Sequence, residues 1–266
     1  MRRLSPRAAP ALWLAIGAVA LRLLLFLGRG DYVAFDEAWY LILGRNLWSG
    51  HGFTLSGLRH VALSPLFPIL AGAAGRALGD AVWGGRLVAA LASGLLVLPC
   101  WTVFSRLGGR RTALLGCAFV AVLPSLAPFV APELVGWDLW VGAGPLFHLC
   151  LFSGMALLLG ALPVRSRPGE RLLRWALAGA AFGLAFLDRP EAVLAASLVV
   201  AAAVALYPGR LRRLPGAALC ALGFLLVTAP YFLYLHDALG HWALKSGHSN
   251  SLLVRLPRSG MASIRA

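Results

Sequence analysis

The chain of 266 residues is 60% hydrophobic and only 13% charged, with a mean hydropathy of +0.80. Soluble domains are about half apolar and about a quarter charged, so this composition excludes an ordinary soluble domain and predicts a membrane protein with many spans. The net charge of +14 comes from 24 basic and 10 acidic residues. Because the arginines cluster between apolar runs, we read them as cytoplasmic loops rather than as a nucleic-acid surface.

The N-terminal segment predicts an uncleaved first span. Met1–Arg7 is basic, and Ala8–Leu27 is apolar except for Arg22. This run is long for a signal peptide, and no small-x-small cleavage site follows it. We expect Arg22, near the far end of the span, to reach outward to the membrane surface.

Six further apolar runs predict six more spans. Two of them, Trp175–Leu187 and Ala192–Tyr207, are short alone, but each can extend into the corner at Asp188–Glu191 and so approach the 17–25 residues that a span needs. The runs are Ala81–Phe104, Thr112–Val130, Leu139–Leu162, Trp175–Leu187, Ala192–Tyr207 and Gly216–Leu235.

The segment Val61–Gly75 is apolar but contains Pro65 and Pro68, and its 15 residues suit an interfacial segment better than a span. If it does not span, every arginine cluster falls on the side of the N-terminus, as the positive-inside rule requires. We therefore predict a cytoplasmic N-terminus and one long external loop, residues 28–80, with helices that lie along the membrane. Nine of the ten acids then fall on the external face.

The acid pair Asp36-Glu37 in this loop is the first candidate site. Asp is a favoured helix cap, so Asp36 could simply cap an amphipathic helix that ends near Gly50. Capping accounts for one acid but not for the second beside it. The functional interpretation makes both carboxylates part of a reaction centre, with Glu133 as a further external acid; the alternative for Glu133 is a solvated turn.

Two basic candidates lie on the same predicted face. Arg59 and His60 stand where an apolar segment begins, and could contact a phosphate or merely anchor the segment at the interface. Arg189 precedes Pro190 and Glu191, and could bind a phosphate, for which planar guanidinium is well suited, or form a salt-bridged turn. We take Arg59, His60, Arg189 and Glu191 as candidate substrate-binding or phosphate-binding residues. The four singly placed cysteines indicate neither a zinc site nor disulfides.

The first span, the loop with "DEAWY" (Asp36–Tyr40), "LSPLFPIL" (Leu63–Leu70) and "RPEAVL" (Arg189–Leu194) together resemble the GT-C membrane glycosyltransferases. The nearest group is family 39, the protein O-mannosyltransferases and aminoarabinose transferases. The resemblance implies an all-α polytopic GT-C-like bundle of about seven transmembrane helices over residues 1–237. It also implies an external C-terminal segment, residues 238–266, that is truncated relative to the members of this family.

The resemblance further implies an inverting transfer of a hexose or pentose from a polyprenyl phosphate to a protein, lipid or glycan on the non-cytoplasmic face of the cell's inner or plasma membrane. Asp36 would be the acid that activates the acceptor, Glu37 would support or orient Asp36, Glu133 would be the second-loop acid and Arg189 a phosphate partner. A divalent ion held by the acids could assist, but no residue is assigned to it. The alternatives are a transporter or lipid flippase, and an inactive truncated relative.

Overall fold

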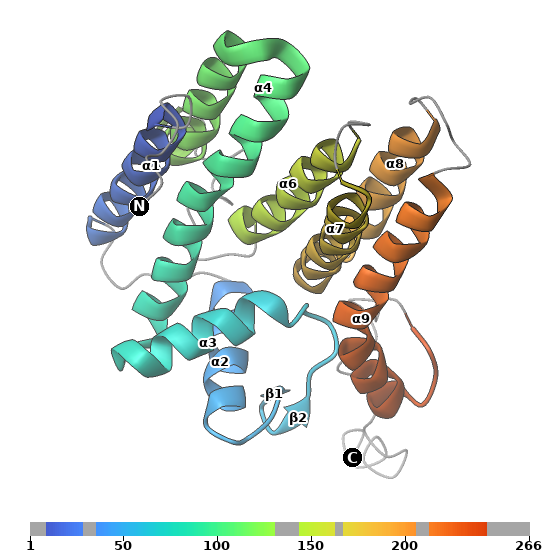
Figure 1. The fold of residues 1–266 in the computed structure, drawn as a ribbon. Coiled ribbons are helices and arrows are strands. Elements are labelled where there is room, and N and C mark those ends of the chain that lie inside the picture. The colour runs from blue at the N-terminus through green and yellow to red at the C-terminus, as the bar shows by residue number, and fades with distance from the viewer. Residues whose placement is uncertain (1–8, 29–35, 131–143, 163–166, 206–212, 244–266) are drawn as a thin grey trace, which may run out of the picture.

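The computed structural model describes residues 9–28, 36–130, 144–162, 167–205 and 213–243 (Figure 1). The elements are, in order, α1 (Ala9–Leu27), α2 (Asp36–Trp48), β1 (Thr54–Leu55), β2 (Leu58–Arg59), α3 (Leu66–Leu78), α4 (Ala81–Val130), α6 (Gly144–Ala161), α7 (Pro168–Asp188), α8 (Ala192–Ala205) and α9 (Leu214–Leu239). The predicted all-α polytopic fold is confirmed. The short antiparallel hairpin of β1 and β2 was not predicted.

Four helices in the described ranges are long and apolar enough to cross a membrane: α1, α4 over Ala81–Val122, α6 and α9. At about 1.5 Å per residue, the 19 residues of α1 cover nearly the whole bilayer core of about 30 Å. The chain is therefore an integral membrane protein. The helix α7 is long enough, but its two arginines, one glutamate and one aspartate lower its hydropathy; it packs between α6 and α9.

The long helix α4 is a hairpin of two helices. The chain turns at Gly109, whose φ of 82° and ψ of −175° are not helical. Glycine adopts this positive φ at little cost. The two arms return side by side, because Cys117 Sγ on the second arm lies 3.6 Å from the Val97 carbonyl oxygen on the first. The predicted pair of spans, Ala81–Phe104 and Thr112–Val130, thus corresponds to these two arms.

Small residues let the long helices approach closely, as is common in membrane bundles. A Cβ on Gly179 of α7 would collide with the backbone of Cys220 on α9, and one on Gly223 of α9 would collide with the carbonyl of Ala176. The helix α9 ends at Leu239 and not at the predicted Leu235. The apolar run used for that prediction stops at His236 and Asp237, but the helix continues through these two polar residues.

The helices α2 and α3 and the hairpin between them form a layer at one end of the bundle. In Figure 1, α3 runs across the direction of the long helices, with α2 packed against it and the hairpin beside the end of α9. Each of α2 and α3 has 13 residues, about 20 Å, which is too short to span. The prediction that Val61–Gly75 is not a span agrees with this arrangement. The α2/α3 end of the bundle is where α1 and α7 end and α4 and α8 begin.

The prediction that Arg22 reaches outward is wrong. Its side chain is only 2% exposed and lies on the same helical face as Phe26, which is 1% exposed. The physical reason is that this face of α1 packs against α4, so the arginine is held inside the protein rather than at the lipid boundary.

Candidate functional site

The acid pair lies where α2 begins. Asp36 is the first residue of this helix, one position before the start at Glu37 that a capping role for Asp36 predicts, and its side chain lies outside the described part of the structure. Glu37, in the first turn, is 6% exposed, so its carboxyl group is enclosed by protein rather than solvated. Acids suit the first turn of a helix because the dipole is positive there. Burial of Glu37 goes beyond what this preference requires.

The helices α2 and α3 hold each other rigidly. A Cβ on Gly44 would collide with the Pro68 carbonyl, and one on Gly72 would collide with the backbone of Gly44. Trp48 Nε1 donates a hydrogen bond to the Ile69 carbonyl at 2.9 Å, and Arg76 donates one back to the Trp48 carbonyl. The start of α2 is therefore carried by a firm two-helix platform at the end of the bundle.

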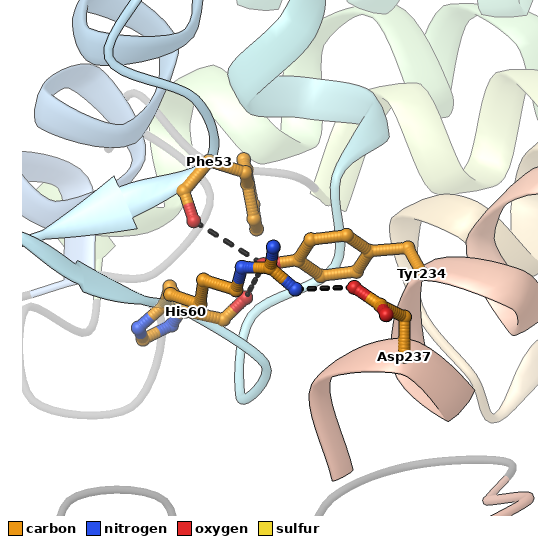
Figure 2. Close-up of polar contacts among 5 residues, drawn as sticks. Phe53, His60, Tyr234 and Asp237 are labelled. Carbon is orange, nitrogen blue, oxygen red and sulfur yellow. Dashed lines mark hydrogen bonds and ion pairs between the residues drawn. The ribbon is translucent and has the colours of Figure 1, made fainter. Parts of the chain in front are cut away.

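Figure 2 shows how the hairpin is tied to α9. The Tyr234 hydroxyl donates to the carbonyl oxygen of His60 at 2.8 Å and lies 3.3 Å from that of Phe53. Arg59 forms an ion pair with Asp237, and both side chains are more than half exposed. Arg59, predicted to bind phosphate, thus has a carboxylate partner in this structure.

His60 has a structural role here. Its Nε2 accepts a hydrogen bond from the Leu63 N–H at 3.1 Å, and its ring makes edge contacts with Trp39 and Phe53. These contacts connect the hairpin to both α2 and the entry of α3. The predicted phosphate contact of His60 stays a prediction, as does that of Arg59.

The corner between α7 and α8 contains a buried acid that the sequence reasoning did not select. Asp188, the last residue of α7, is 3% exposed, and neither carboxyl oxygen makes a hydrogen bond of normal geometry with the described residues. The backbone N–H groups of Phe67 and Phe147, in the first turns of α3 and α6, are nonetheless near enough to favour the charged form of this carboxyl group. The guanidinium group of Arg189 has the same effect. The carboxyl group of Asp188 is therefore incompletely satisfied by hydrogen bonds from the described residues.

The predicted residues of this corner face outward instead. Arg189 and Glu191 are both exposed. Their neighbour Asp188 could have been found from the sequence as an acid that ends an apolar run, and Arg86 as a lone base within another run. Arg86 is 2% exposed and lies 5.9 Å from the Phe26 ring centre and 5.2 Å from that of Trp83.

The acids gather at the α2/α3 end among the described residues. Glu170, near the start of α7, is the exception. Asp80 has a plain structural role, because its Oδ1 accepts from the N–H groups of Val82 at 2.8 Å and Trp83 at 3.0 Å and caps α4. Glu133 lies outside the described residues. Within the described ranges, no group of three or more His, Cys, Asp or Glu side chains could hold a metal ion.

Comparisons with known proteins point to membrane sugar transferases. No family model matches the chain. The undecaprenyl phosphate-alpha-4-amino-4-deoxy-L-arabinose arabinosyl transferase of Pseudomonas aeruginosa (strain LESB58) is 30% identical over 159 residues, 59% of this chain and 28% of that protein. The apo crystal structure of the Archaeoglobus fulgidus oligosaccharyltransferase matches 99% of this chain and 39% of its own, with a TM-score of 0.54 and 13% identity. The chain thus spans less than half the length of either protein.

Proposed function

We propose, from the GT-C membrane glycosyltransferase fold that this chain has, that it transfers a sugar from a polyprenyl phosphate to an acceptor at the membrane face that carries α2 and α3. One observation carries the proposal: the Asp36-Glu37 pair stands at the start of a helix fixed across the end of an apolar bundle, with Glu37 buried there. The activity for which the 30% identical relative is named supports the same donor class.

The location suits a lipid-linked donor. The polyprenyl tail of such a donor lies in the hydrocarbon core, and its phosphate lies at the membrane surface, level with the ends of the spans. The α2/α3 layer occupies such an end. We take this end as the non-cytoplasmic face, because the arginine clusters at the α4 turn and the start of α7 belong to the opposite end.

The reaction is a single displacement at the anomeric carbon. The acceptor oxygen forms the new bond to this carbon as the bond to the phosphate oxygen breaks, and the configuration inverts. Asp36 takes the acceptor proton as general base, and Glu37 orients the acceptor or Asp36. The polyprenyl phosphate leaves with the bonding electron pair.

The remaining predicted residues act on the leaving group and the substrate. Arg189 compensates the negative charge of the departing phosphate, as guanidinium groups do in transferase sites. Arg59 and His60 contact the phosphate from the hairpin. Glu191 contacts the substrate beside Arg189. Glu133 is the second external acid. The sugar is a hexose or a pentose, and the acceptor is a protein, lipid or glycan.

The test uses membranes that carry the full chain and a polyprenyl-phosphate sugar with a labelled sugar. We expect label transfer with the wild-type chain and none above background with Asp36→Asn. Glu170→Gln is the matched control, because it neutralises an exposed acid at the opposite end of the bundle. Movement of the labelled lipid across the membrane without transfer would instead favour a transporter or flippase.

A further inference from the structure

Two arginines converge at the end of the bundle opposite to α2 and α3. There α6 ends, and Gly160 in its last turn lies between Arg106 of α4 and Arg174 of α7. A Cβ built on Gly160 would lie 3.0 Å from one Nη1 atom, that of Arg174, and 3.6 Å from the other, that of Arg106. The two guanidinium groups therefore border the same position, and the absence of a side chain at Gly160 lets that of Arg174 approach the end of α6 closely.

No carboxylate neutralises this pair within the described part of the chain. The ion pair that the described residues form, Arg59 with Asp237, lies at the α2/α3 end of the bundle. Glu170, one turn before Arg174, is exposed and makes no ion pair with it. Arg174 donates a hydrogen bond to the Gly160 carbonyl at 2.5 Å, but a helix C-terminus supplies only about half a negative charge. Two like charges at close range are thus left without a full counter-charge.

The surroundings of the pair suit a lipid. Leu107 follows Arg106 and is 70% exposed, and Leu173 precedes Arg174 and is 58% exposed. Exposed leucines at a helix end in a membrane protein face acyl chains, while long basic side chains reach the headgroup level. Basic pockets between membrane helices are known to receive anionic headgroups.

We propose that Arg106 and Arg174 form a binding site for the phosphate of an anionic phospholipid headgroup. The two planar guanidinium groups donate to the phosphate oxygens, and Gly160 lets the Arg174 guanidinium lie against the end of α6 beside that of Arg106. The site is at the opposite end from the proposed sugar-transfer site, and it does not depend on that function.

Binding of defined lipids tests the site. The purified full chain in neutral detergent is titrated with phosphatidylglycerol, with phosphatidylcholine and with inorganic phosphate, and bound molecules are counted by native mass spectrometry. We expect preferential binding of phosphatidylglycerol. Arg106→Gln and Arg174→Gln should each weaken it at least about fivefold, and Arg111→Gln, an exposed charge at the nearby turn, less than about twofold.

Gly160→Ala tests the close approach of Arg174 to α6 without changing the charge. The added methyl group should displace the Arg174 guanidinium and weaken phosphatidylglycerol binding. Arg106 is exposed, so Arg106→Gln and Gly160→Ala carry the test if Arg174→Gln does not fold. Equal losses in all three arginine variants would mean general surface charge and overturn the site. Absence of a preference for phosphatidylglycerol, or equal occupancy by inorganic phosphate, would overturn the lipid assignment.

Discussion

The Tyr234 hydroxyl on α9 donates a hydrogen bond to the His60 carbonyl at 2.8 Å, joining two segments 174 residues apart in sequence. This contact ties the hairpin of the α2/α3 layer to the last long helix. The adjacent Arg59–Asp237 ion pair is exposed, and such pairs contribute about 0–1 kcal/mol. The half-buried tyrosine is therefore the firmer of the two connections.

Tyr234→Phe removes this hydrogen bond while keeping the ring. The loss of about 1 kcal/mol should loosen the hairpin locally and speed amide exchange of His60, whose N–H bonds to the Phe53 carbonyl, about fivefold. Hydrogen–deuterium exchange checks this result. Tyr231→Phe is the control, because that ring stacks on Tyr234 without bonding to the hairpin. Equal protection in wild type and Tyr234→Phe would mean that the hydroxyl does not hold the hairpin.

Gly44→Ala and Gly72→Ala should each destabilise the α2/α3 pair. The added Cβ meets backbone, which cannot rotate away, and overpacking of this kind costs about 1–3 kcal/mol. Thermal unfolding in detergent measures the effect. Gly17→Ala in α1 is the matched control, because its Cβ meets nothing within 4 Å and alanine favours a helix. An unfolding temperature unchanged by both α2/α3 variants would refute the close approach.

Asp188→Asn should raise the unfolding temperature. A buried group without full hydrogen bonds costs about 1–3 kcal/mol, and more when it is charged, so the neutral amide should be easier to bury. Asp237→Asn serves for comparison, since its exposed carboxyl should matter little. A clear fall in the unfolding temperature with Asp188→Asn would show that the carboxylate has a strong partner after all.

Membrane topology can be read by cysteine labelling from outside the cell. Leu58→Cys in the hairpin should react with an impermeant thiol reagent, because the residue is 59% exposed at the face proposed to be external. Thr112→Cys, exposed at the α4 turn, should react only after permeabilisation. The four native cysteines are buried and should give little background. Reversed labelling would place the α2/α3 layer on the cytoplasmic side.

Much of the fold was predictable because a membrane imposes length and apolarity on each span. The two arms of α4 and the short α3 were expected from the length of the apolar runs, the placement of the arginines, and Pro65 and Pro68. The two-residue strands β1 and β2 were not expected, because so short a pairing leaves no alternation to detect.

The site was predictable only as a set of candidates. Asp36 and Glu37 stood out in the sequence as two adjacent acids after an apolar run. The burial of Asp188 and Arg86 could not be predicted, because it depends on which helix face meets a neighbour. The bond between Tyr234 and His60 depends on how distant segments meet, which no local pattern records. Arg22 was misjudged for the same reason, because distance from the span end says nothing about which side packs on α4.

The most direct measurement of the central claim is the rate at which Asp36→Asn transfers a labelled sugar from its polyprenyl phosphate, in membranes that hold the full chain at wild-type level. Loss of a general base costs about 10²–10⁴-fold in rate, so transfer by the variant should fall to background while Glu170→Gln retains it. Transfer by Asp36→Asn at the wild-type rate would contradict the assignment of Asp36.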